Sequence, residues 1–107
     1  MKTVILFFLF LIVSTAGFSQ VFVNGQDINK NPDISYVRLS MVGLNGKVAI
    51  DIGDSRRYSI DDAEKKPIVF NNFMLAVNYL AKNGWTLQTA YVFGGWEYYV
   101  LKKKEGL

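Results

Sequence analysis

Residues 37–41 (VRLSM) and 47–52 (KVAIDI) alternate between apolar and polar side chains, which is the period of a β-strand. Asn45-Gly46 lies between the two segments, and both residues tolerate the positive φ of a type I′ turn. If Asn45-Gly46 is a two-residue turn, Met41 pairs with Ile50, and the apolar sets of the two strands face each other. The pattern therefore predicts an antiparallel hairpin.

A second hairpin is predicted near the C-terminus, where aromatic residues surround Gly94-Gly95 (GWTLQTAYVFGGWEYYVLKKK, residues 84–104). With the two glycines as the turn, Tyr91 pairs with Tyr98. Burying large rings is an efficient way to stabilise a small domain without disulfides. We therefore expect one face of the hairpin to be core, formed by Trp85, Leu87, Thr89, Tyr91, Phe93, Trp96, Tyr98 and Val100. The other face, with Val92, Tyr99 and Leu101, is expected to meet solvent or a partner.

One helix is predicted over residues 70–83, between the two hairpins. Asn71 is suited to the N-cap, and Gly84 to the left-handed position after the C-terminus. Apolar residues recur at helical spacing, at Phe73, Ala76, Val77 and Leu80. The fold class is thus α+β: a small antiparallel sheet of four to six strands formed by two hairpins, packed on one face by a single helix at about 70–83.

The N-terminal segment has the pattern of a secretory signal peptide. A cationic start is followed by an unbroken apolar run over residues 4–13 and a small, polar stretch over 14–20. That run is short for a bilayer span, which takes roughly 20 residues. Gly17 and Ser19 suit cleavage before Gln20, and Ser14 with Ala16 is the alternative pair. We predict a signal peptide at 1–19 and a single domain at 20–107 in an exported, periplasmic or secreted protein; an uncleaved anchor is the alternative.

Two residue types are absent from the sequence, cysteine and histidine. A lipoprotein anchor, a disulfide and a thiol nucleophile are thereby excluded, and the commonest general base and nitrogen ligand for metals are missing. We therefore expect no cofactor, no metal site and no catalytic residues. The formal net charge is only +3, and Lys102, Lys103 and Lys104 account for the surplus.

The C-terminal half is similar to a known pattern. Residues 78–87 (NYLAKNGWTL), followed by a strand, a turn and residues 99–103 (YVLKK), resemble a family of small bacterial domains of unknown function. Those domains read helix, Gly-Trp-Glu-Leu, strand, turn and a strand ending in Lys or Arg; Thr86 departs from the usual Glu. With its leader, the whole chain resembles small uncharacterised secreted proteins of Gram-negative bacteria. The resemblance implies a fold and a compartment but no activity.

Two acidic clusters invite catalytic or metal-binding interpretations. Asp51 and Asp54, with Arg56 and Arg57 nearby, resemble the carboxylate pair of a small hydrolase, although acids at a strand end are usually solvated. The acids at 61–64 lack the spacing of a calcium-binding loop.

The basic residues do not predict a nucleic-acid partner. The net charge is small, acids lie among the bases, and export argues against that class. We expect instead a non-catalytic binding module of the bacterial envelope or extracellular space, without stable membrane insertion after cleavage. Its partner would be a protein, peptide or glycan, and a carboxylate-dependent hydrolase or a self-associating structural protein (a homo-oligomer) are the alternatives. The candidate binding residues are Trp96, Tyr99, Leu101, Arg56 and Arg57.

Overall fold

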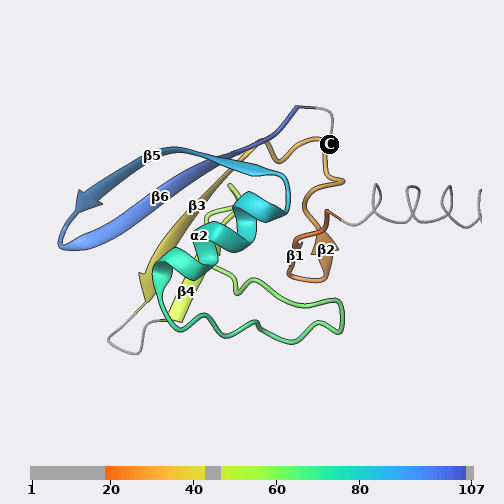
Figure 1. Ribbon diagram of the computed structural model, residues 1–107, viewed down its shortest axis with the longest axis horizontal. Helices are drawn as coiled ribbons and strands as arrows, with labels where there is room; N and C mark the ends of the chain where they lie inside the picture. The colour runs from red at the N-terminus through yellow and green to blue at the C-terminus, as the bar shows by residue number, and fades with distance from the viewer. Residues whose placement is uncertain (1–18, 43–46, 106–107) are drawn as a thin grey trace, which may run out of the picture.

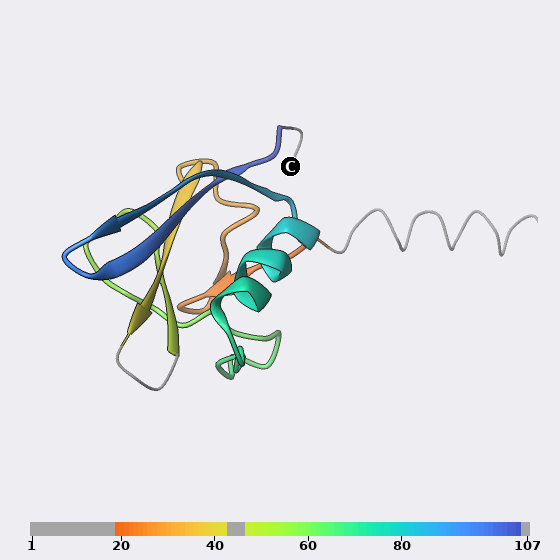
Figure 2. The same ribbon diagram turned by 60° about the vertical axis from the view of Figure 1, so that its left-hand side comes forward.

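The computed structural model describes residues 19–42 and 47–105 (Figures 1 and 2). A two-stranded sheet and a four-stranded sheet of order β4-β3-β6-β5 are both antiparallel. One helix, α2, is found in these ranges and packs against the larger sheet. The α+β prediction is thereby confirmed. The elements are β1 (Phe22–Val23), β2 (Gln26–Asp27), β3 (Tyr36–Val42), β4 (Lys47–Asp51), α2 (Phe73–Lys82), β5 (Trp85–Phe93) and β6 (Trp96–Lys103).

The β3–β4 hairpin forms as predicted, but its register differs. Val42 pairs with Lys47, so Met41 lies opposite Val48 rather than Ile50. The predicted turn, Asn45-Gly46, lies outside the described residues. A shift of two residues leaves every side chain on its original face, and this is why the alternation predicted the correct faces and could not distinguish the two registers.

Helix α2 begins later than predicted. Its N-cap is Asn72, not Asn71, and the Asn72 side-chain oxygen accepts a hydrogen bond from the Leu75 amide at 3.0 Å. Gly84 has a φ of +95°, as predicted for the residue that follows the helix. In the two described ranges, no helix has the length and apolar character that a membrane span requires.

A β-bulge changes the predicted faces of the C-terminal hairpin. Gly94 and Gly95 both have positive φ, and Tyr91 pairs with Tyr98, as predicted. The register shifts between Leu87 and Thr89, where one extra residue is inserted in β5. One extra residue moves all following side chains to the opposite face, because side chains alternate along a strand. The prediction that Tyr91 and Tyr98 lie on the same face as Trp85 is therefore wrong.

The helix covers the face that carries Tyr99 and Leu101. The Phe73 ring meets the Tyr99 ring edge to face, with centroids 4.6 Å apart, and Leu101 is fully buried opposite Val37 of β3. We refer to this as the inner face of the sheet. The core residues there and beneath the N-terminal segment are Val21, Val23, Ile28, Ile34, Val37, Leu39, Ile50, Ile60, Phe73, Ala76, Val77, Leu80, Trp85 and Leu101.

Buried polar contacts attach the N-terminal segment to the rest of the fold. The indole Nε1–H of Trp85 donates to the Asn29 side-chain oxygen at 2.7 Å, and the Asn29 amide donates to the Asn83 carbonyl at 2.8 Å. Both polar groups of the Asn29 side chain are satisfied, as burial requires. One asparagine thus joins the loop after β2 to the start of β5.

Unequal burial predicts different costs for two leucines that pair with each other on the inner face, Leu87 and Leu101. Leu101→Ala should lower the free energy of unfolding by about 2–5 kcal/mol, because it leaves a cavity in the core. Leu87→Ala should cost less than about 1 kcal/mol, because that side chain is 44% exposed. Urea denaturation of both variants measures the difference, and equal losses would contradict the burial of Leu101 beneath α2 and the exposure of Leu87.

Candidate functional site: an aromatic platform on the outer face of the sheet

The outer face of the sheet, opposite α2, carries a cluster of aromatic side chains. Among them, Tyr91 is 40%, Phe93 74% and Trp96 43% exposed. Cross-strand pairing places Phe93 beside Trp96 and Tyr91 beside Tyr98. Together with Arg38 of β3, these four residues form what we call the aromatic platform. Solvent-exposed apolar side chains gathered on one face mark an interaction surface more often than single exposed ones do.

Arg38 holds the centre of the platform. Its Nη2 lies 3.1 Å from the Asp51 carboxylate, and its Nη1 donates to the Tyr91 hydroxyl at 3.2 Å. Its Cζ lies 4.9 Å from the centroid of the Tyr98 ring, a cation–π arrangement. The hydrogen bond to Tyr91 and the nearby Asp51 carboxylate raise the pKa of the guanidinium, although burial opposes them. The cation is therefore permanent, and its charge is balanced by Asp51.

The two central rings are stacked. Tyr91 and Tyr98 have centroids 5.1 Å apart and planes 20° apart. Since β3 pairs with β6 only from Tyr98 to Lys102, the part of the β5–β6 hairpin that carries Phe93 and Trp96 extends beyond β3 (Figures 1 and 2). We call this part the hairpin arm (residues 92–97).

The predicted binding residues do not form one site. Trp96 lies on the platform and is 43% exposed, although the regular hairpin of the sequence analysis places it on the core face. Tyr99 and Leu101 point to the inner face, where Tyr99 packs on Phe73 and Leu101 is fully buried. The expectation that they form an exposed face is therefore wrong, and the cause is the bulge. Arg56 and Arg57 are exposed on the loop after β4, at the edge of the sheet opposite β5.

The two acids of the hydrolase interpretation, Asp51 and Asp54, have separate partners. The Asp51 carboxylate binds Arg38 and accepts the Gly53 amide at 2.8 Å. The Asp54 carboxylate accepts from the Tyr58 hydroxyl at 2.5 Å, and that bond lowers the pKa of Asp54 below its ordinary value. A carboxylic acid that acts as a general acid needs a raised pKa, whereas the hydrogen bond from Tyr58 lowers the pKa of Asp54.

No described residues gather as a metal site. Within the described ranges, no group of three or more acidic side chains is arranged so that it could hold a metal ion. This applies to the acidic loop over residues 61–64 as well, where Asp62 Oδ1 accepts the amides of Glu64 and Lys66 and stabilises a turn.

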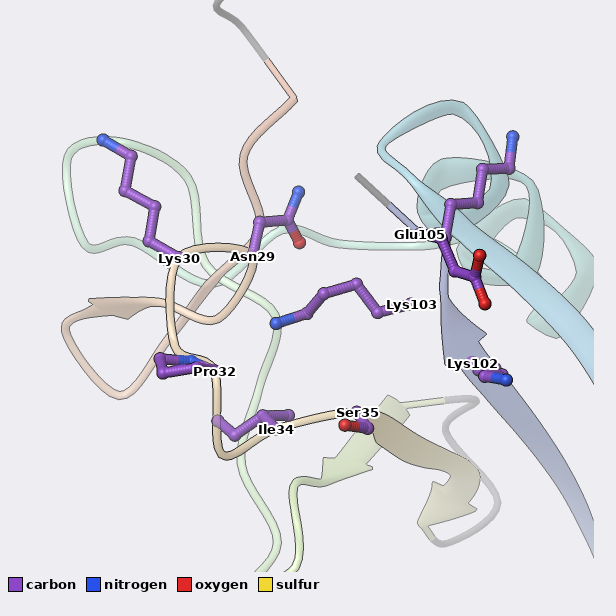
Figure 3. A pocket seen from close by; sticks show the side chains of 9 residues that line it. Asn29, Lys30, Pro32, Ile34, Ser35, Lys102, Lys103 and Glu105 are labelled. Atoms are coloured by element: carbon purple, nitrogen blue, oxygen red, sulfur yellow. The ribbon is translucent and has the colours of Figure 1, made fainter. Parts of the chain in front are cut away.

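A cavity of about 470 Å³ lies where the loop after β2 meets the end of β6 (Figure 3). Lys103 crosses it, and its ammonium donates to the Asn31 carbonyl at 2.8 Å. Burial lowers the pKa of Lys103, and the nearby Asp27 carboxylate opposes that shift. Lys30 points away from Lys103 (Figure 3). The lysines therefore do not converge on a ligand, and Lys103 fastens the loop to the sheet.

Sequence reasoning missed Tyr91, Phe93, Tyr98 and Arg38 as members of a surface. A regular hairpin places the first three on the core face, and the bulge moves them to the outer face. One signal was available: polar residues of β5 fall at Thr86 and Gln88, and then at Thr89. That change of phase in the alternation marks the bulge.

Comparison with known proteins adds no assignment, since no protein-family model, curated protein or solved structure matches this chain.

The geometry around Asp54 predicts a low titration midpoint. Side-chain NMR should give a pKa for Asp54 below 3.8, its ordinary value, because the Tyr58 hydroxyl stabilises the charged form. In Tyr58→Phe the midpoint should move upward, towards that value. A midpoint above 3.8 in the wild type would contradict this geometry and would agree with a general acid.

Proposed function

We propose that the protein is an exported, non-catalytic binding module of the bacterial envelope or extracellular space, and that it binds its partner on the aromatic platform. Export is supported by the signal-peptide pattern of residues 1–19. The observation that carries the proposal is the exposure of Phe93 and Trp96 on an arm that extends beyond β3. Large exposed rings on a projecting element need a covering surface to leave water.

The chemistry of the platform favours a protein or peptide partner. Trp, Tyr and Arg are the residue types that contribute most to protein–protein binding, and the platform combines all three. The charge of Arg38 is balanced by Asp51, so the platform does not require an anionic ligand. Arg38 also fixes the Tyr91 ring by a hydrogen bond, which reduces the entropy lost when a partner binds. A neutral glycan, which stacks on rings through its apolar face, is the alternative.

The hydrolase alternative is not favoured by any contact of the acids. Asp51 serves the platform by holding Arg38, and Asp54 is bonded to Tyr58 on the adjacent loop. Two carboxylates that flank a scissile bond would need different pKa values, one of them raised. The contacts of Asp51 thus support a positioning role beside the platform.

A pull-down from an envelope extract with the mature protein tests the proposal. Phe93→Ala, Trp96→Ala should weaken capture of the partner by about thirtyfold or more, because truncation of a hot-spot ring costs at least about 2 kcal/mol. Both side chains are exposed, so the variant should keep its circular dichroism and unfolding midpoint.

Two further variants serve as controls. Met74→Ala, Leu75→Ala removes exposed apolar side chains from α2, on the other side of the sheet, and should leave capture unchanged. Arg56→Ala, Arg57→Ala tests the arginines at the far edge and should also leave it unchanged. If the platform variant captures as much as the wild type, the proposal is wrong. Protease treatment of the extract should abolish capture of a protein and spare a glycan.

A further inference from the structure

Strand β5 forms an unprotected edge of the four-stranded sheet. In the order β4-β3-β6-β5, no described strand pairs with the outer side of β5. The other edge is covered, since Ile50 of β4 and Tyr58 exchange two backbone hydrogen bonds of 2.8 and 2.9 Å. β5 contains no charged residue and no proline, which are the usual means of preventing edge-to-edge pairing. Its bulge at 87–89 restricts regular pairing to Thr89–Phe93.

The backbone groups that point out of this edge can be identified. Phe93 and Trp96 flank a two-residue turn, so they form a hydrogen-bonded pair, and hydrogen-bonded pairs alternate along an antiparallel ladder. Tyr91 therefore bonds to β6. The N–H and C=O groups of Ala90 and Val92 point the other way, to the free edge of the sheet.

We propose that a second copy of this chain pairs antiparallel with β5 at this edge, with Tyr91 on the two-fold axis. In that register Ala90 lies opposite Val92 of the copy, so the outward groups of the two strands satisfy each other. Thr89 lies opposite Phe93 of the copy, and both belong to the outer face. Every pair thus joins residues of the same face, which is the condition for one continuous sheet.

The distribution of charge favours a copy as the occupant of the edge. The segment from Trp85 to Trp96 carries no charge, so two copies of it do not repel each other. The start of β5 pairs with Lys102 and Lys103 of β6, and Lys104 is the next residue of the chain. Antiparallel pairing of two β5 strands therefore places the lysines of the two copies at opposite ends of the interface.

The hairpin arm also gains stability from a neighbour. A two-stranded ribbon is marginally stable in water, and a third strand supplies the pairing and burial that it lacks. Val92, on the inner side, is 69% exposed and would pack against Ala90 of the copy. The dimer would place the two platforms side by side, with the two Tyr91 residues adjacent. It does not depend on the proposed function, because pairing uses the edge and ligand binding uses the face.

Single cysteines test the register, since the chain has none of its own. Tyr91→Cys should give a disulfide-linked dimer on mild oxidation, because residues facing each other in a non-hydrogen-bonded pair have Cα atoms about 4.5 Å apart, within disulfide range. Thr89→Cys and Phe93→Cys should each stay uncrosslinked alone and should crosslink when mixed. Crosslinking of all three variants to the same extent would overturn the register.

Sedimentation equilibrium over a concentration series tests the dimer itself. Val92→Pro removes an outward N–H and leaves the β5–β6 ladder intact, so it should raise the dimer dissociation constant about tenfold or more. Its unfolding midpoint should match the wild type at concentrations low enough for both to be monomeric. Val92→Ala keeps the N–H and is the matched control, with a smaller effect.

Three outcomes would overturn the dimer: a monomeric wild type at every concentration, equal dimerisation of Val92→Pro and wild type, or protection of the Ala90 and Val92 amides from hydrogen exchange only when a captured partner is present. Phe93→Ala, Trp96→Ala should still dimerise, so failure of the platform and failure of the dimer are distinguishable.

Discussion

The extra residue between Leu87 and Thr89 determines which side chains of the C-terminal hairpin are buried. Before it, Trp85 points into the core; after it, Tyr91 and Phe93 point to the outer face. On the opposite strand, Tyr99 and Leu101 thereby become the residues that α2 covers. A regular hairpin could not bury Trp85 and expose Tyr91, because they would share a face. The composition of the platform and of the core under α2 both follow from this irregularity.

Trp85 also connects the bulged strand to the N-terminal segment. Its ring is fully buried, its Nε1–H is bonded to Asn29, and the Lys103 ammonium lies 5.6 Å from its centroid. Val21, Val23 and Ile28 add apolar area beneath this contact. The aromatic residues of the described core are Trp85 and Phe73, whereas Phe93 and Trp96 of the arm lie outside it. Exposed rings on a domain of this size are costly unless a partner covers them, which is the physical basis of the proposed function.

Much of the fold could be predicted from the sequence, because periodicity determines element type and face. The helix stripe at Phe73, Ala76, Val77 and Leu80 is buried as predicted, and Gly84 ends the helix. Both hairpins were predicted. The register of β3–β4 could not be predicted, since a shift of two residues leaves the alternation of apolar and polar side chains unchanged. The cap at Asn72 was missed because an adjacent asparagine offers the same hydrogen-bonding group.

The candidate site was harder to predict than the fold. Trp96 is a candidate binding residue in the sequence, but a regular hairpin places it on the core face and places Tyr99 and Leu101 on the exposed face. The one sign of the bulge in the sequence is the change of phase at Thr89. The most direct test of the bulge is the NOE pattern of the Phe73 ring. The bulged register predicts contacts with the Tyr99 ring and none with Tyr98, whose ring lies against Tyr91 and Arg38. Contacts from Phe73 to Tyr98 or Tyr91 would show a regular hairpin with the aromatic rings in the core, and would contradict the platform.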